Sequence, residues 1–487
     1  MAEIHQTTLT PDKLELLTAW LPSQRWYAGK GGTPTLRPLG GYRLDDPTGE
    51  VGIEVMVVAD DSGRAPVVYQ VPLTYRGAPL AGAETALVGT TEHGVLGPRW
   101  VYDGPHDPVF AAQLLELIQG RAVPQAQRPS DTPDPTVQRH AVDPHPVTLA
   151  SSSVLRGEQS NTSVICQVVD AAGAAAEPVI IKVFRTLHPG ENPDVVVQSA
   201  LTEAGSTQVP HTVGFVSGEW QDPTTGERVR GHLAFAQRFL PGVEDAWRVA
   251  LRAATDDADF TGEARELGEA TARIHRSLAE TLGTTAATDD VRHELMTIIR
   301  ARYAAAVGEA PALAADNAEI QGALDRLAAA PWPDLQRIHG DYHLGQVLRT
   351  DTGWVAVDFE GEPLRPLPER TRPDLALRDV AGMLRSFDYA GGSVELSRPG
   401  RSSREWVRST QQAFLDGYTA VGGIDLVAQA PVLRALELDK ALYEISYEVR
   451  NRPDWVGIPS AAVARLVADT AAPQRSQPGV ATTKGVS

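Results

Sequence analysis

Residues 336–362 read QRIHGDYHLGQVLRTDTGWVAVDFEGE, and this stretch sets the fold that the rest of the chain has to complete. The apolar runs VL and WVAV are separated by the polar, glycine-ended segment RTDTG, a pattern typical of a β-hairpin. Asp341 and Gln346 precede the first run and Asp358 follows the second, so we expect the hairpin to bring the three side chains together. Phosphoryl transfer needs a carboxylate at the attacking hydroxyl and oxygen ligands for Mg2+. The stretch therefore predicts a phosphotransferase loop with Asp341 as the base and Gln346 and Asp358 as metal ligands.

Three further side chains of this stretch are candidates for supporting roles. Glu360 either assists the metal or only orders the loop. His339 is expected to be a structural hydrogen-bonding residue, because Asp341 already occupies the position of the base. His343 is predicted to bind the acceptor. The alternative interpretation of the whole stretch is a surface hairpin with acidic ends.

The region 151–184 has the form of a strand, a polar turn and two further strands. Its turn, RGEQSNTS at 156–163, contains a glycine, hydroxyls and free backbone N–H groups, which suit the phosphates of ATP. An ordinary hairpin turn is the alternative. The residues assigned to the nucleotide are Ser160, Asn161, Thr162 and Ser163.

Lys182 is a single charge inside the apolar run PVIIKVF. Burying an isolated charge is costly, and an ATP phosphate together with a glutamate would compensate it. Glu203, in a helix expected over 194–205, is the predicted partner. The alternative is a lysine on an edge strand whose amine reaches water.

A cluster of aromatic and charged residues near the C-terminus is suited to a sugar, which presents hydroxyls and apolar ring faces. Glu444 and Glu448 share one helix face, where two carboxylates need a cation or a ligand between them. A solvated helix side with a buried tryptophan is the alternative. The residues assigned to the acceptor sugar are Tyr443, Glu444, Glu448, Arg452 and Trp455.

Composition limits the classes of partner that the chain is expected to bind. The chain has 487 residues, enough for about two to three domains. Its net charge of −18 argues against nucleic acid or an anionic membrane, and its single cysteine excludes an internal disulfide and a multi-cysteine metal site. The N-terminus lacks the features of a signal peptide. We expect a cytoplasmic monomer that binds ATP and a small sugar.

Segments over most of the chain resemble the actinobacterial maltokinases, members of the aminoglycoside-phosphotransferase-like branch of the protein-kinase-like fold. The segments are LPSQRWYAGK at 21–30, GEQSNTS at 157–163, KVFR at 182–185, PGENPD at 189–194, and the regions 339–363, 378–389 and 437–455. The resemblance implies an α+β bilobal fold with an N-terminal β-rich cap. It also implies that ATP and Mg2+ are used to convert maltose to maltose 1-phosphate for glycogen or α-glucan synthesis.

The expected organisation follows from this resemblance and from local patterns. Short apolar runs over 51–102 predict an antiparallel sheet, and 110–119 a helix. The expected parts are a cap at 1–120, a linker at 121–147, a nucleotide-binding lobe at 148–240, a mainly helical lobe at 241–468 and a disordered tail at 469–487.

Two alternatives to a maltokinase stay open. The segment PGVEDAW at 241–247 lacks the Gly-Trp pair more usual in maltokinases, and an acidic pocket would also suit an amine, so glucosamine or another amino sugar is a second acceptor. The other is a non-catalytic pseudokinase, against which the retained Lys182, Asp341, Gln346 and Asp358 argue. Association with a trehalose-converting enzyme is a further open prediction.

Overall fold

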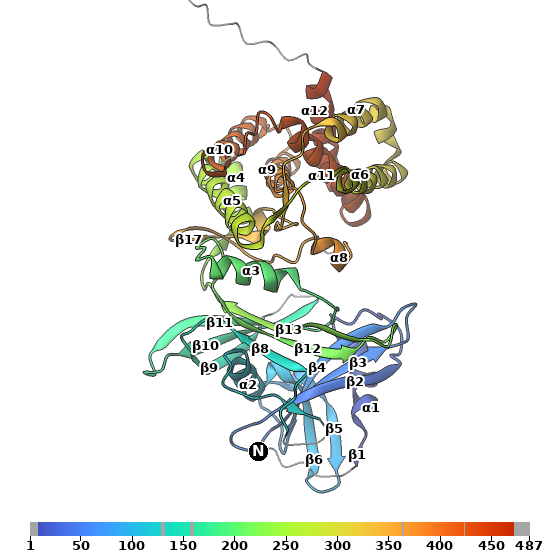
Figure 1. The fold of residues 1–487 in the computed structure, drawn as a ribbon, viewed down its shortest axis with the longest axis vertical. Helices are drawn as coiled ribbons and strands as arrows, with labels where there is room; N and C mark the ends of the chain where they lie inside the picture. Colours follow the sequence, from blue (N-terminus) through green and yellow to red (C-terminus); the bar gives the residue numbers. More distant parts are fainter. Residues whose placement is uncertain (1–7, 128–131, 156–159, 363–364, 423, 472–487) are drawn as a thin grey trace, which may run out of the picture. The chain divides into compact units, whose positions relative to one another are not determined.

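The computed structural model describes residues 8–127, 132–155, 160–362, 365–422 and 424–471. These residues form two compact units, which we call the sheet unit (up to residue 243, with 355–372) and the helical unit (244–354, with 373 onward). Strands coloured blue to green make up most of the sheet unit, and helices coloured light green to red make up the helical unit (Figure 1). No helix among these residues is both long and apolar enough to span a membrane. The tail beyond residue 471, for which disorder was predicted, lies outside them.

The sheet unit contains two antiparallel sheets. In the described part of the chain the first has the order β1 (Leu9–Thr10), β5 (Leu87–His93), β6 (Gly97–Asp103), β4 (Val67–Arg76), β3 (Gly52–Asp60), β2 (Leu36–Leu44) and β7 (Gln125–Ala126). The second has the order β8 (Val137–Ala141), β12 (Thr212–Gln221), β13 (Arg228–Arg238), β11 (Ala175–Phe184), β10 (Asn161–Val169) and β9 (Thr148–Val154). The helices of this unit are α1 (Lys13–Trp20), α2 (Pro108–Ile118), α3 (Pro193–Glu203) and α8 (Leu367–Arg370).

The first sheet is buried on both faces, which explains the continuous apolar run in β3. Val55 and Val57 point into a core that they share with the second sheet and α2, whereas Met56 and Val58 point into a core formed with α1. Successive side chains of a strand alternate between faces, so a strand covered on both sides loses its polar positions. The antiparallel sheet expected over 51–102 and the helix expected near 110–119 are confirmed.

The shared core joins the predicted cap to the strands assigned to the nucleotide. Phe110 and Leu114 of α2 pack in it with Val164 and Cys166 of β10. Burial raises the pKa of the Cys166 thiol to about 12. Residues 121–147, expected to be a linker, supply β7 to the first sheet and β8 to the second. The two sheets are therefore one packed body.

The helical unit contains the predicted loop with Asp341. Its helices in the described residues are α4 (Ala246–Asp256), α5 (Thr261–Leu282), α6 (Asp289–Glu309), α7 (Asn317–Ala329), α9 (Leu377–Ser397), α10 (Arg404–Gly422), α11 (Ala430–Asn451) and α12 (Gly457–Ala471). The remaining strands are β14 (Glu244–Asp245), β15 (Thr284–Thr285), β16 (Leu335–Gln336), β17 (Val347–Thr350) and β18 (Gly353–Ala356). The predicted hairpin is present as β17 and β18, with β14 as the third strand of its sheet.

Candidate active site

Lys182 of the sheet unit projects from β11 and is held by carboxylates. Its Nζ lies 2.7 Å from Asp194 Oδ2 and 3.1 Å from Asp358 Oδ1. Burial lowers the pKa of Lys182, but the neighbouring Asp194, Asp358 and Glu360 outweigh this effect and hold the pKa well above its ordinary value. The ammonium therefore stays charged, as a group that binds phosphate must.

Asp194, and not Glu203, is the ion-pair partner of Lys182. Asn192 caps α3 by accepting a hydrogen bond from the Asp194 N–H, Pro193 is the first helical residue, and Asp194 is fully buried in the first turn. Glu203 is the last residue of the same helix. The sequence signal was the Asn-Pro-Asp helix start, where a carboxylate also meets the positive end of the helix dipole.

Asp358, two residues after the end of β18, has an uncommon backbone conformation. Its φ is +68°, in the left-handed region that side chains other than glycine seldom adopt. The next residue, Phe359, donates its N–H to Asp194 Oδ1 at 2.9 Å, which fixes the turn against α3. Oxygen atoms of Asp194, Asp358 and Glu360 lie within 4.8 Å of one another. The three carboxylates together suit a hard cation.

The four residues assigned to the ATP phosphates have different surroundings. Residues 156–159 of the turn lie outside the described residues, and Ser160 is exposed. The side-chain amide of Asn161 donates to Glu360 Oε1 at 2.9 Å, which links this strand to the carboxylates. The Thr162 hydroxyl accepts a hydrogen bond from buried Arg185, and Ser163 is fully buried. The latter two side chains thus belong to the protein interior.

Asp341 of the helical unit follows a loop whose backbone is held by Asp379, near the start of α9. The Asp379 carboxylate accepts the N–H groups of His339 (2.8 Å) and Gly340 (2.9 Å). Burial raises the pKa of Asp379, but hydrogen bonds from His275 and Gly340 and the nearby imidazoles outweigh this and lower it. Gly340 has a φ of +84°, which explains the glycine between the histidine and the aspartate.

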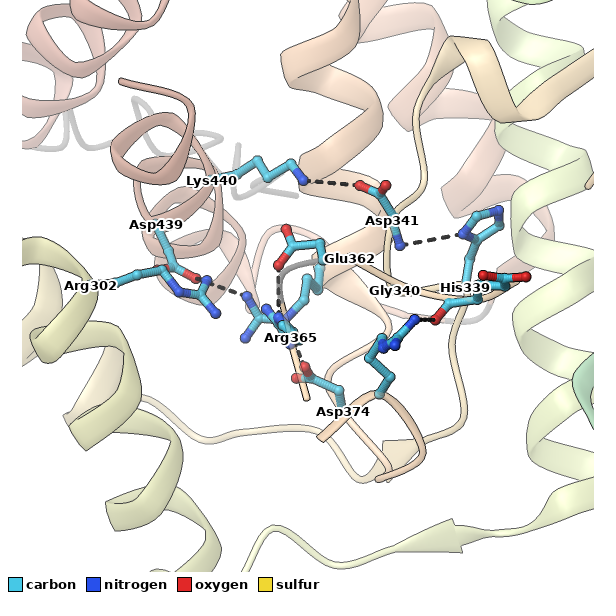
Figure 2. A network of polar contacts seen from close by, with 12 residues as sticks. Arg302, His339, Gly340, Asp341, Glu362, Arg365, Asp374, Asp439 and Lys440 are labelled. Carbon is cyan, nitrogen blue, oxygen red and sulfur yellow. Dashed lines mark hydrogen bonds and ion pairs between the residues drawn. The ribbon is translucent and has the colours of Figure 1, made fainter. Parts of the chain in front are cut away.

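His339 is a buried structural group of this loop. It is 2% exposed, and its Nδ1 accepts the Asp341 N–H at 3.3 Å (Figure 2). Gln346 ends the short 3-10 turn η5 (Leu344–Gln346), and its backbone N–H donates to the His343 carbonyl. The His343 ring lies beside the predicted base, with Nε2 4.0 Å from Asp341 Oδ2.

Lys440 of α11 reaches the predicted base. Its Nζ lies 3.3 Å from Asp341 Oδ1, and each side chain is about one-fifth exposed (Figure 2). The ammonium also lies over the ring of Tyr443, 5.1 Å from its centre. Lys440 was not assigned a role from the sequence, although it is the one basic residue in the segment ELDKALYE. The predicted base thus forms an ion pair with a lysine of the same unit.

The two glutamates assigned to the sugar are paired with arginines. Glu444 Oε2 accepts from Arg385 Nη2 at 2.7 Å, and Glu448 Oε1 from Arg452 Nη2 at 2.5 Å. Tyr389 also donates to Glu448, at 3.0 Å. Glu448 is 1% exposed, so its carboxylate is part of the interior of the unit. The cation required between the two carboxylates is therefore supplied by the protein.

The aromatic residues assigned to the sugar lie around the same arginines. The Arg452 guanidinium lies 4.8 Å from the centre of the Trp455 ring and 5.6 Å from that of Tyr447. Trp455 also stacks on Tyr389, with ring centres 6.3 Å apart. Of the residues assigned to the acceptor, Tyr443 contacts Lys440 and His343 lies beside Asp341.

Glu437 is a further buried carboxyl of α11. It is 8% exposed, and burial raises its pKa from 4.5 to about 7. Arg465 of α12, Arg385 of α9 and Arg434 of α11 oppose this rise, whereas Asp388 of α9 adds to it. A raised pKa stabilises the fold at pH values below about 4.5, and this contribution is lost as the pH rises through 7.

We expect Glu437→Gln to remove this pH dependence. At pH 8 the variant should be more stable than the parent protein by about 1–3 kcal/mol, because no charge is buried, and at pH 5 the two should differ little. Denaturant unfolding at both pH values measures the difference. Glu405→Gln, on an exposed pair with Arg408, is the control. An equal gain at both pH values would contradict the assignment.

Comparison with known proteins identifies the family. Residues 178–423, half of the chain, match the family described as "Phosphotransferase enzyme family". The chain belongs to this family. Residues 20–107 match the "Maltokinase N-terminal cap domain". The family predicted from the sequence is thus confirmed as a phosphotransferase with a maltokinase-type cap.

Similar proteins of the same family include two glucosamine kinases. The chain is 31% identical over 335 residues to that of Streptacidiphilus jiangxiensis, covering 64% of this chain and 72% of the relative. It is 29% identical over 398 residues to that of Mycolicibacterium smegmatis, covering 76% and 90%. A solved structure described as glucosamine kinase in complex with glucosamine, ADP and inorganic phosphate superposes with a TM-score of 0.66 at 25% identity, covering 94% of this chain and 99% of that chain.

These relationships confirm the predicted enzyme class. The protein is an ATP-dependent carbohydrate phosphotransferase with an α+β, bilobal, protein-kinase-like fold and a β-rich N-terminal cap. Membership of this family disfavours the pseudokinase interpretation.

Proposed function

We propose that this kinase phosphorylates maltose at its anomeric hydroxyl, giving maltose 1-phosphate for glycogen or α-glucan synthesis. The observation that carries the proposal is the Lys440 ammonium, 3.3 Å from the carboxylate of Asp341. An acceptor hydroxyl has to approach Asp341 beside this fixed positive charge. A neutral sugar can do so without electrostatic cost, and the maltokinase-type cap supports the same assignment.

A protonated amino sugar fits these surroundings less well. Lys440 and an ammonium about 8 Å away would repel by about 2 kcal/mol at an effective dielectric constant of about 20, and the Asp341 carboxylate offsets part of this repulsion. Glu444 and Glu448, which could otherwise attract an amine, already accept hydrogen bonds from Arg385 and Arg452. Glucosamine remains the second candidate acceptor, because two similar proteins are glucosamine kinases.

The roles that we propose for the reacting groups follow their surroundings. Asp341 orients the acceptor hydroxyl and takes its proton; its backbone N–H donates to His339, whose own N–H is held by Asp379. Lys182, kept charged by Asp194, binds the phosphates of ATP. Transfer is direct, without a phosphoenzyme. The association with a trehalose-converting enzyme stays a prediction.

The donor atoms near Asp358 fit Mg2+, which prefers oxygen ligands. Asp358, Glu360 and Asp194 offer carboxylates whose oxygens lie close together, and Gln346 is the predicted amide ligand. We propose that Asp358 and Gln346 hold the ion and that Glu360 assists. When bound, Mg2+ would neutralise charge on the phosphates and polarise them.

The proposal is tested by following ADP release with ATP and Mg2+ in the presence of maltose, glucosamine, glucose, trehalose or an aminoglycoside. The phosphorylated product is identified by NMR. Turnover on maltose with a new anomeric phosphate would support the proposal. A higher kcat/KM for glucosamine than for maltose would show that glucosamine, and not maltose, is the acceptor, and would leave the enzyme class unchanged.

We expect Lys440→Met to weaken discrimination against an amino sugar. Removing the charge at nearly constant chain length should raise kcat/KM for glucosamine about thirty-fold, because about 2 kcal/mol of repulsion disappears. Arg450→Gln, on the same helix but on an exposed pair with Glu309, is the control and should leave this value unchanged. If kcat/KM for glucosamine stays constant in Lys440→Met, the charge at residue 440 does not select the acceptor.

A further inference from the structure

Arg185 lies at the junction between the cap sheet and the strand that carries Lys182. It directly follows β11 and is fully buried. Its Nη2 donates to both carboxylate oxygens of Asp103, at 2.8 and 2.6 Å, and its Nε donates to the Thr162 hydroxyl at 2.8 Å. The guanidinium lies 4.8 Å from the centre of the Trp26 ring. One side chain therefore joins the cap, at Asp103 and Trp26, to β10.

The ion pair between Arg185 and Asp103 allows little variation in geometry. A buried guanidinium is strongly destabilising unless a carboxylate and hydrogen-bond acceptors surround it. Asp103, at the end of β6, is 3% exposed and supplies the carboxylate. Because a poorly aligned pair would leave a charge uncompensated in the interior, the position of Asp103 dictates where Arg185 and its acceptor Thr162 lie.

The contacts continue from Thr162 to the nucleotide side of the same strands. Asn161, which precedes Thr162, donates to Glu360 Oε1 at 2.9 Å. Ser163, which follows Thr162, is paired in register with Lys182 of β11. Lys182 in turn binds Asp194 and Asp358. A short chain of bonded neighbours thus connects the carboxylate of Asp103 in the cap to the groups around Lys182.

A second set of contacts holds the end of β11 to the cap. The Gln70 side chain of β4, 1% exposed, donates to the carbonyls of Phe184 (2.9 Å) and Leu233 (2.8 Å). The Gln70 N–H donates to the Arg185 carbonyl, and the Leu187 N–H to the Val68 carbonyl, each at 2.8 Å. Residues immediately after Lys182 are thereby bonded to a central strand of the cap sheet.

We infer that the cap is a structural part of the nucleotide site, in which Asp103 and Arg185 are positioning residues for Lys182 and Asn161. The cap thereby acts on ATP binding. This role does not depend on whether maltose or glucosamine is the acceptor, since it concerns the strands that carry the phosphate-binding groups.

The test uses the full-length kinase with Asp103→Asn, which keeps the shape of the side chain and removes its charge. Asp107→Asn is the matched control, because Asp107 is also fully buried and forms a bidentate pair with a cap arginine, Arg76. In the described structure, neither Asp107 nor Arg76 forms a hydrogen bond with Arg185 or Thr162. ADP affinity is measured by calorimetry, the KM for ATP and for the acceptor by ADP release, and stability by thermal unfolding.

Asp103→Asn should weaken ADP binding and raise the KM for ATP by about two- to thirty-fold, with the KM for the acceptor within about two-fold of its original value. Asp107→Asn should lower the Tm without changing ADP affinity. A folded Asp103→Asn protein with unchanged ADP affinity would overturn the inference, as would an equal loss in both variants. If Asp103→Asn does not fold, Thr162→Val is used instead, because it removes only the hydrogen bond between Arg185 and the Thr162 hydroxyl. Unchanged ADP affinity in Thr162→Val would equally overturn the inference.

Discussion

Replacing Asp341 by asparagine is expected to lower kcat by a factor of about 10² to 10⁴, the range typical for loss of a general base. Asparagine has the same size and keeps an oxygen near Lys440, but it cannot take the proton of the acceptor hydroxyl. The backbone contacts of the loop to Asp379 do not involve the replaced atoms. ADP affinity should therefore change little. Steady-state turnover and calorimetry with ADP measure the two quantities.

Asp351→Asn is the control for this variant. Asp351 is an exposed residue in the turn of the neighbouring hairpin. Its substitution makes the same chemical change at a residue that is not proposed to act as a base. It should retain normal turnover. Near-normal kcat in Asp341→Asn would show that the base lies elsewhere, and a large loss of ADP affinity would show that the substitution disturbs more than the acceptor.

The second large effect is expected for Asp358→Asn. The variant replaces a carboxylate that faces Lys182 and is proposed to bind Mg2+, so several kcal/mol of transition-state stabilisation should disappear. This corresponds to a fall of about 10² to 10⁴ in kcat/KM for ATP. Asparagine tolerates the left-handed conformation of residue 358, so the substitution adds no backbone strain.

A binding measurement separates loss of the ion from loss of chemistry. In the parent kinase, Mg2+ should raise the affinity for ADP, and EDTA should abolish turnover. In Asp358→Asn the affinity for ADP should no longer respond to Mg2+. An unchanged response would mean that other oxygen ligands, such as those of Glu360 or Asp194, are sufficient to hold the ion, and the assignment of Asp358 would then be wrong.

Local patterns made the antiparallel sheet over 51–102, the hairpin and the helices near 110–119 and 194–205 predictable. The continuous apolar run of β3 predicted a strand because such runs are short and rich in valine, and the hairpin followed from a glycine-ended polar turn between two such runs. The sequence did not reveal that Val55 and Met56 face two different cores. Which partner covers each face of a sheet depends on packing between distant segments, and periodicity within one strand carries no information about it.

The site was predicted less well where residues pair across the fold. Glu203 was chosen for Lys182 by its charge and its place in a helix, but the helix cap at Asn192 places Asp194 beside the lysine instead. Glu444 and Glu448 suggested an open sugar site, because the sequence could not show that Arg385 and Arg452 neutralise them. Residue type indicates what a side chain can bind, and only the fold decides which neighbour reaches it first.

Cys166 offers a way to observe the body shared by the two sheets in solution. The thiol is fully buried in that core, it is the only cysteine of the chain, and its pKa is raised to about 12. A thiol reagent added to the native kinase can therefore react only when this core opens. The labelling rate consequently reports the free energy of that opening, in the same way as amide hydrogen exchange. The natural sequence thus already contains a reporter for the joint between cap and catalytic strands, and no engineered probe is required.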